Sequence, residues 1–223
     1  MSAADPVDRA SGRLVPLPDV PFLVGELDPS AVLEPFVAEG VLVDNDVNWA
    51  ALAEREHGCA SGVDDFVHVH LGEGLGAAVV GDGRLHGGLA GEIAHVITAG
   101  PDGSAMPLPE VFAALGLRRE ESTAVDVDAV RDALGITDVA RPLARAVCGV
   151  LSSVVALVNP ELVVLGGPWA PAVVPAVAEE FARWPRNAPV ASGQVTDPEE
   201  AGARSSAAEE LRERLIASAR SAP

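Results

Sequence analysis

A short glycine-rich turn carries a single carboxylate between two apolar stretches. Residues 66–71 and 77–80 are apolar in the pattern of two antiparallel strands, joined at this corner. Because glycine lets the backbone approach a ligand closely and turn its N–H groups toward an anion, the corner could cradle a phosphate. A plain hairpin turn has the same composition, so both interpretations stay open. The turn consists of Gly72, Glu73, Gly74, Leu75 and Gly76.

Two further groups of polar residues have a spacing that suits a binding pocket. Glu92 and His95 lie three residues apart, so a helical turn would point both side chains into one pocket. A solvated glutamate and an internally bonded histidine are the alternative. Upstream, Asn45 and Asp46 precede an expected helix, which Asp46 or Asn48 could cap. A carboxylate such as that of Asp46 can act as a general base only within hydrogen-bond reach of the proton it removes.

Strands that alternate with helices place the elements around these residues in the α/β class. Asp28 and Pro29 predict a helix that runs to Glu39 and is broken at Pro35. Residues 41–43 predict a short buried strand, and residues 98–109 have the composition of a loop. We expect a second tight turn at Asp82-Gly83 and, before the hairpin, a helix that ends near Gly58. Further helices are expected over residues 110–115, 126–134, 137–158, 171–184 and 198–220, and strands over residues 162–165 and 190–195.

Composition limits the classes of function. The 223 residues suffice for one sizeable core or two small lobes. The net charge is −18, so we expect no direct binding of nucleic acid, which needs a basic patch. Cys59 and Cys148 form no Cys-x-x-Cys pair and indicate reduced thiols in a cytoplasmic protein. Residues 1–25 lack a signal-peptide pattern, and the apolar run 146–158 is shorter than the ~20 residues that span a bilayer, so we expect no membrane segment.

Four segments in one order resemble the ROK family, which comprises repressors, open reading frames and sugar kinases. Residues 43–48 resemble its Asn-Asp segment, and residues 71–76 resemble its second phosphate loop. Residues 91–95 resemble its Glu-x-Gly-His sugar motif, with Ala94 in place of the glycine. Residues 159–167 resemble its adenosine-side strand and turn, of which Gly166 and Gly167 would be a remnant. The resemblance implies an α/β fold of the actin-like, ribonuclease H-like ATPase type, as in ROK proteins.

The resemblance also implies which residues bind a ligand. Asp46 matches the aspartate that takes the proton from the sugar hydroxyl in ROK kinases, and Asn45 would bind a neighbouring hydroxyl. Glu92 and His95 match residues that contact the sugar, and Glu110 lies near the position of another sugar-binding glutamate. The implied ligand is a sugar or a sugar derivative such as a sugar phosphate.

The chain departs from the family where ROK proteins bind zinc. That site uses one histidine and three thiolates, but residues 100–109, at the place of the cysteine cluster, contain no cysteine. We therefore expect no metal. His68 and His70 fall on one face of a strand and could bind a metal, but no third ligand is evident in the sequence. We expect that face to be solvated.

Two further departures concern ATP. The kinases of the family resemble Gly-Thr-Gly where this chain has Glu73, and a carboxylate would repel a polyphosphate by an energy on the order of several kcal/mol. The family's Asp-x-Gly-Gly-Thr motif has no match, and residues 6–14 resemble the middle of a ROK chain. We therefore expect residues 1–40 to be a remnant of the N-terminal lobe and a linker, with most of that lobe missing, and residues 41–223 to be the C-terminal sugar-binding lobe.

These observations favour a sugar-sensing, non-catalytic domain of a transcriptional regulator in carbohydrate metabolism, without a cofactor. One alternative is a glucokinase-like sugar kinase that uses ATP and Mg²⁺, with Asp46 as the general base. Another is an inactive, truncated remnant. We expect a homodimer that uses the apolar helix at residues 143–158. Sugar binding by this chain alone is expected in the millimolar range, because half a cleft leaves polar groups in competition with water.

Overall fold

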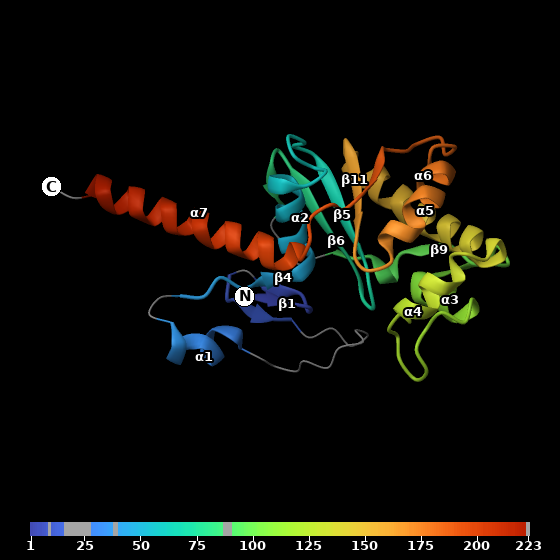
Figure 1. The fold of residues 1–223 in the computed structure, drawn as a ribbon, viewed down its shortest axis with the longest axis horizontal. Coiled ribbons are helices and arrows are strands. Elements are labelled where there is room, and N and C mark those ends of the chain that lie inside the picture. Colours follow the sequence, from blue (N-terminus) through green and yellow to red (C-terminus); the bar gives the residue numbers. More distant parts are fainter. Residues whose placement is uncertain (9, 16–27, 38–39, 87–90, 222–223) are drawn as a thin grey trace.

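The computed structural model describes residues 1–8, 10–15, 28–37, 40–86 and 91–221, and a mixed β-sheet forms its centre, with helices on both faces (Figure 1). The central strand β5 (Phe66–Leu71) lies between β11 (Leu162–Gly166), which is parallel to it, and β6 (Leu75–Gly81), which is antiparallel. The edges of the sheet are β12 (Val190–Ser192), next to β11, and β7 (Arg84–Leu85) and β8 (Gly91–Glu92), both next to β6. Strand and helix alternate along the chain, which confirms the α/β class.

The predicted hairpin at the glycine-rich turn is confirmed. β5 and β6 pair from Phe66 with Val80 to Leu71 with Leu75. The predicted second turn also forms, because Asp82 and Gly83 take positive φ angles of 50° and 68° and lead β6 into β7. Two successive positive φ values are typical of the turns that match the twist of a hairpin.

Alternate residues of β5 face two different layers of helices. Val67, Val69 and Leu71 belong to the larger core, which includes α5 (Thr137–Val158) and α6 (Ala170–Phe181). Phe66 faces the opposite side and packs with residues of α2 (Asp46–His57). A central strand with helices on both sides has no solvated face.

The expectation of a solvated face at His68 and His70 was therefore wrong. His68 is only 1% exposed, and within the described chain its Nδ1 has no hydrogen-bond partner. Burial, followed by the neighbouring His70, lowers the pKa of His68 to about 3, and burial also lowers the pKa of His70. His68 is consequently neutral at physiological pH.

The N-terminal part forms small separate units. β1 (Ser2–Ala3) pairs in parallel with β4 (Asp44–Asn45), and β2 (Val7–Asp8) pairs with β3 (Arg13–Leu14). The strand predicted at residues 41–43 is thus displaced to residues 44–45, because β1 offers its backbone partners there. The division of the chain at residue 40 stays a prediction.

The first predicted helix is shorter than expected. α1 (Pro29–Leu33) begins where the sequence indicates, since Asp28 accepts a hydrogen bond from the Ala31 N–H at 3.0 Å. The chain then tightens into a 3₁₀ turn over Glu34–Phe36, which contains Pro35. Proline has no N–H to donate and disrupts a helix interior. The predicted end at Glu39 lies outside the described residues.

The loop predicted at residues 98–109 was wrong. β9 (Ile97–Ala99) and β10 (Ala105–Pro107) form a short hairpin that leads into α3 (Leu108–Ala114). The Gly, Asp and Ser residues mark only the turn between these strands, and the Thr98 hydroxyl ties the hairpin to α5 by donating to the Ala146 carbonyl at 2.7 Å. Strands of three residues are too short to give a periodic pattern.

The predicted helices in the second half of the chain form. α4 (Val127–Ala133) is capped by Asp126, and α5 ends at Asn159, which is left-handed (φ 51°) before Pro160. Among the described helices only α5 is long and apolar enough to cross a membrane. Its inward residues are buried in the larger core, as in the core helix of a folded lobe.

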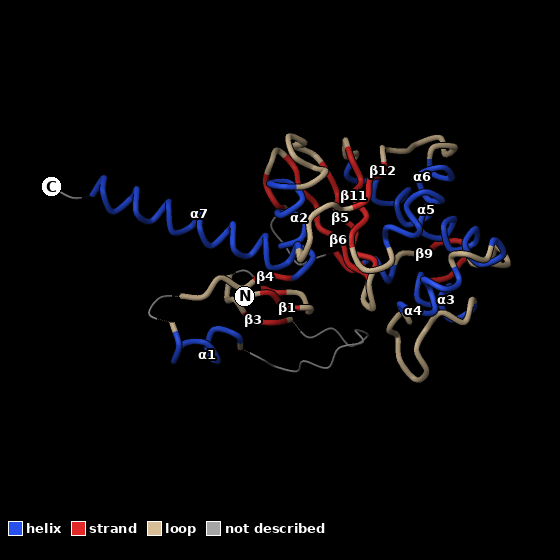
Figure 2. The backbone as a smooth tube through the Cα atoms, in the orientation of Figure 1, coloured by secondary structure: helices blue, strands red, loops and turns tan. Residues whose placement is uncertain are grey.

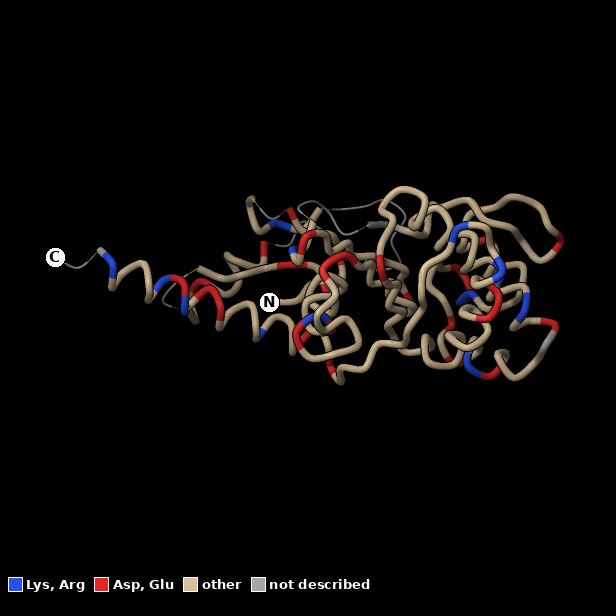
Figure 3. The backbone as a smooth tube through the Cα atoms, turned by 90° about the horizontal axis from the view of Figure 1, so that it is seen from above, with Lys and Arg blue, Asp and Glu red and all other residues tan. Residues whose placement is uncertain are grey.

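The last helix, α7 (Pro198–Ser221), packs on α2 at its start and then extends away from the body of the protein (Figures 1 and 2). The backbones meet at Gly202, where an added Cβ would lie 1.9 Å from the Trp49 carbonyl oxygen. Glutamate–arginine ion pairs follow the exposed length of α7 (Figure 3). Leu211, Leu215 and Ile216 are exposed there.

Candidate functional site

Asn45 holds the N-terminal segment against the start of α2. Its Oδ1 accepts a hydrogen bond from the Val47 N–H at 3.0 Å, and its Nδ2 donates to the carbonyl oxygens of residues 3–5 at 3.1–3.4 Å. Asn45 is therefore the cap of α2, and the prediction of Asp46 or Asn48 was wrong because the helix begins one residue earlier than expected. Its contact with a sugar stays a prediction. For such a contact, the Asn45 side chain has only the second lone pair of its Oδ1 left.

Asp46 is the first residue of α2 and is partly buried. Its Oδ1 accepts the N–H of Val47 at 2.8 Å. Burial, followed by the negative charges of Glu199 and Asp5, raises the pKa of Asp46 to about 7, although the Val47 N–H acts in the opposite direction. A carboxyl group with such a pKa can accept a proton near neutral pH, which is what a general base needs.

Two acidic residues near Asp46 were missed from the sequence. Asp5 follows β1 and Asp46 follows β4. Because these two strands are parallel, both residues lie beyond the carboxyl end of the strand pair. Asp5 is buried and its Oδ1 has no hydrogen-bond partner within the described chain, and burial raises its pKa. Glu199, in the first turn of α7, acts on both Asp46 and His70. A Pro-Glu-Glu start is common to many helices and gave no signal of this role.

Glu54 fixes the connection that leads to α7. Its carboxylate is 1% exposed and accepts three backbone N–H groups, those of Gln194 at 2.7 Å, Val195 at 2.8 Å and Cys59 at 3.0 Å. Through these bonds Glu54 joins α2 to the chain after β12. It therefore helps to place Glu199 beside Asp46.

Glu92 and His95 occupy the strand–turn that follows the hairpin. Glu92 lies on β8, where its backbone pairs with Gly76 of the glycine-rich turn. His95 ends a 3₁₀ turn (Ile93–His95) and is exposed. The Glu92 side chain lies outside what the structure describes, so a shared pocket for the two residues stays a prediction.

Glu110 lies in the first turn of α3 and is exposed. Its Oε1 pairs with Arg118 Nη1 at 3.0 Å. Within the described residues, no hydrogen bond or ion pair links Glu110 to Asp46, Asn45 or His95. Its assignment as a sugar ligand stays a prediction.

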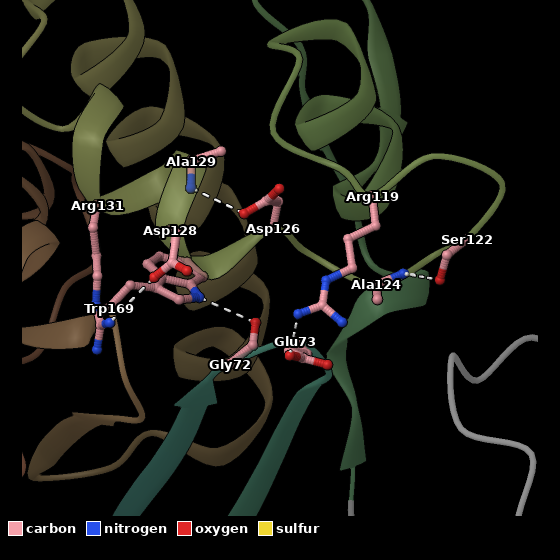
Figure 4. A network of polar contacts seen from close by, with 10 residues as sticks. All are labelled: Gly72, Glu73, Arg119, Ser122, Ala124, Asp126, Asp128, Ala129, Arg131 and Trp169. Atoms are coloured by element: carbon pink, nitrogen blue, oxygen red, sulfur yellow. Dashed lines mark hydrogen bonds and ion pairs between the residues drawn. The ribbon is translucent and has the colours of Figure 1, made fainter.

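The glycine-rich turn is held against the turn that follows β11. The indole Nε1 of Trp169 donates to the Gly72 carbonyl at 3.1 Å (Figure 4), and Gly167 has a φ of 96°. An added Cβ at Gly167 would lie 2.5 Å from the Leu71 carbonyl oxygen, so only glycine fits this contact. The two segments that resemble the phosphate and adenosine sides are thus adjacent.

An arginine reaches into the glycine-rich turn from the loop before α4. Arg119 Nη2 lies 2.5 Å from Glu73 Oε1, and Figure 4 shows the two side chains pointing toward each other. The Glu73 carbonyl also accepts the N–H of Val125 at 3.0 Å. Nothing in the sequence pattern paired these residues.

Metal-binding groups are scattered among the described residues. No group of three or more His, Cys, Asp or Glu side chains there could hold a metal ion. Cys59 and Cys148 are both free thiols.

Comparison with known proteins shows what this chain is similar to. The ROK family model matches residues 7–110. A glucokinase of Halalkalibacterium halodurans is 32% identical over 160 residues, which are 57% of this chain and 48% of the glucokinase. A protein of Clostridium perfringens is 33% identical over 181 residues, 75% of this chain and 60% of that relative. The match spans about half to three fifths of the length of these relatives.

Solved structures share the fold. A ROK family glucokinase from Streptomyces griseus, in complex with glucose and AMPPNP, has a TM-score of 0.69 and 23% identity, over 91% of this chain and 78% of that one. A ROK family transcriptional regulator, a homologue of the E. coli MLC protein, has a TM-score of 0.68 and 20% identity, over 92% and 61%. The fold is the α/β, actin-like fold of these sugar kinases and regulators. Residues 7–110 thus match the ROK family model, and the chain shares the fold of ROK family kinases and regulators.

Proposed function

We propose that this chain is a sugar-sensing domain of the transcriptional-regulator type, which binds a sugar at the start of α2 and does not phosphorylate it. Asp46, partly buried at the end of β4, would accept hydrogen bonds from sugar hydroxyls, with Asn45, Glu92 and His95 as further contacts. The relatives include both a kinase and a regulator, so the choice between them depends on residues of this chain.

The observation that carries the choice is the carboxylate of Glu73 in the glycine-rich turn. Phosphoryl transfer depends almost entirely on positioning and on stabilising the charge of the phosphates. A carboxylate about 5 Å from a phosphate charge opposes binding by about 3 kcal/mol at an effective dielectric constant near 20, and by less where water screens the pair. Glu73 is partly exposed and pairs with Arg119, so the net repulsion is smaller than this value, but the carboxylate still disfavours ATP.

The test is calorimetry of the folded protein against hexoses, N-acetylhexosamines and their 6-phosphates. We expect binding to at least one sugar, and a loss of about tenfold or more in Asp46→Asn, since a hydrogen bond to a charged group contributes about 1.5–3 kcal/mol. Asp132→Asn, an exposed change on α4, is the control and should bind as the unmodified chain does. No heat with any sugar, from a sample with a cooperative melt, would refute the sensor function.

A sugar kinase is the second candidate, and one observation favours it. The pKa of Asp46, about 7, suits a general base at neutral pH. A coupled assay of ADP release with Mg²⁺ and the sugar that binds separates the two functions. The sensor proposal predicts no turnover, and turnover that Asp46→Asn abolishes would replace it with the kinase.

We also propose that the domain forms a homodimer in the cytoplasm. Most of the apolar face of α5 is buried within its own lobe, which leaves Leu157, 87% exposed, and Val158 at its end. Light scattering at micromolar concentration tests the assembly, and a monomer mass would contradict it. A cooperative thermal melt distinguishes this folded domain from an inactive remnant.

A further inference from the structure

The segment that carries Arg119 is shaped by its own backbone. The Arg119 N–H donates to the Ala124 carbonyl at 3.0 Å, and the Asp126 N–H donates to the Leu117 carbonyl at 2.9 Å. The Val125 N–H then ties this closed loop to the Glu73 carbonyl at 3.0 Å. Because all three are backbone bonds, they persist whatever side chain stands at position 73.

The ion pair between Glu73 and Arg119 is exposed to water. The side chain of Glu73 is 36% exposed and that of Arg119 is 50% exposed. Pairs of this kind contribute little to stability, typically below about 1 kcal/mol. The carboxylate can therefore be removed without unfolding the turn, and Arg119 would then lack its partner.

Two other acidic side chains near the turn, those of Asp126 and Asp128, are engaged elsewhere. Asp126 caps α4 through the Ala129 N–H, and Asp128 pairs with Arg131 (Figure 4). Arg131 also donates to the Pro168 carbonyl. Glu73 is the one acidic side chain bonded to Arg119 among the described residues.

The backbone of the turn offers donors beside the arginine. Within the described part of the chain, the N–H groups of Glu73 and Gly74 have no hydrogen-bond partner, whereas that of Gly72 donates to the Gly74 carbonyl. Successive free N–H groups in a glycine-rich turn attract anions, and a guanidinium adds a charged fork for a phosphate or a carboxylate.

We propose that this turn is an anion site closed by its own side chain, in which the Glu73 carboxylate occupies the place on Arg119 that a phosphate of a polyphosphate chain would take. This inference rests on the proposed function, because it gives the reason why the domain does not use ATP. It assigns Arg119 as the anchor for the phosphate and Glu73 as the group that excludes it.

The experiment measures the affinity of the full chain for tripolyphosphate and for ATP, with adenosine as the arm without phosphate. We expect Glu73→Thr to bind tripolyphosphate about tenfold or more tightly than the unmodified chain, because a repulsive charge is lost and Arg119 is released. Glu73→Gln keeps the length of the side chain and should move in the same direction. Adding Arg119→Ala to Glu73→Thr should return the affinity to the original value.

The matched control is Glu120→Thr, which removes the same charge from an exposed position next to Arg119. A gain in Glu120→Thr equal to that in Glu73→Thr would reduce the effect to net charge and overturn the proposal. Equal affinity of the unmodified chain and Glu73→Thr would also overturn it, as would tight binding that survives Arg119→Ala. If Glu73→Thr raises the affinity for tripolyphosphate and for ATP equally, the site binds the phosphate chain alone. If the affinity for ATP rises more, the site also contacts the nucleoside. Both results support the proposal.

Sugar titrations on the same variants keep the two proposals apart. Sugar affinity should be unchanged by Glu73→Thr, because the proposed sugar contacts lie at α2 and β8. Absence of sugar binding in every variant refutes the sensor function and leaves the polyphosphate result interpretable.

Discussion

Asp46→Asn should stabilise the protein at alkaline pH and not at acid pH, although it removes a proposed ligand-binding group. Asparagine keeps an oxygen for the Val47 N–H and cannot ionise. The carboxyl group of Asp46, in contrast, must ionise in a partly buried position next to Glu199 and Asp5. Functional groups are often held in such unfavourable surroundings.

The magnitude follows from the pKa. Burial raises the pKa of Asp46 from 3.8 to about 7, so the folded state binds a proton more tightly than the unfolded state. Stability from this group is therefore fully present below the unfolded pKa and is lost as pH rises through the folded pKa. At about 1.4 kcal/mol per pH unit the whole loss is at most about 4 kcal/mol. Part of it occurs below pH 5, and partial exposure reduces it further, so we expect about 1–2 kcal/mol between pH 5 and pH 8.

Urea denaturation of both proteins at pH 5, 6, 7 and 8 provides the assay. The difference in unfolding free energy should grow with pH in favour of Asp46→Asn and level off above pH 8. Asp132→Asn, on the exposed surface of α4, should show no such growth. A constant difference between the two proteins across this range would refute the reasoning that Asp46 ionises at a cost.

Two further substitutions and one labelling experiment test the packing of the protein. Glu54→Gln should lower the free energy of unfolding by about 2–3 kcal/mol, because the glutamine N–H₂ would face a backbone N–H that now donates to the carboxylate. The control is Glu56→Gln at an exposed position, and equal stability of the two variants would contradict the role of Glu54 in joining α2 to the chain after β12. Gly202→Ala should lower the free energy of unfolding, measured with denaturant, by about 1–3 kcal/mol, because the added methyl group would clash with α2. Alanine favours a helix more than glycine does, so a stabilised variant would disprove the close contact of α7 with α2. Cys59 and Cys148 should react slowly with a thiol reagent at pH 8 in the native protein, since burial raises the pKa of each to about 12; fast labelling of either would count against its burial.

The sequence alone was sufficient for elements that short-range physics specifies. Period-2 apolar residues around a glycine-rich turn predicted β5 and β6, and the Asp28-Pro29 pair predicted the start of α1. The long apolar repeat that ends before Pro160 predicted α5. In each case the residues that interact are neighbours along the chain, so the pattern contains the physical cause.

Composition was misleading where burial depends on distant elements. A His-x-His pair indicates a polar, solvated strand face, but His68 is buried because helices cover both sides of the sheet. The hairpin of β9 and β10 was hidden for a related reason, since its strands are short and depend on the contact of Thr98 with α5.

The site itself was decided by tertiary structure. The sequence identified Asp46 and the glycine-rich turn. It did not indicate that burial, followed by the charge of Glu199 on α7, would raise the pKa of Asp46, or that Arg119 would pair with Glu73. Acidic residues at helix starts and arginines in loops are ordinary surface choices, so they carry no local signal of a partner. Their interaction is Coulombic and depends on distance in space, which only the path of the folded chain determines.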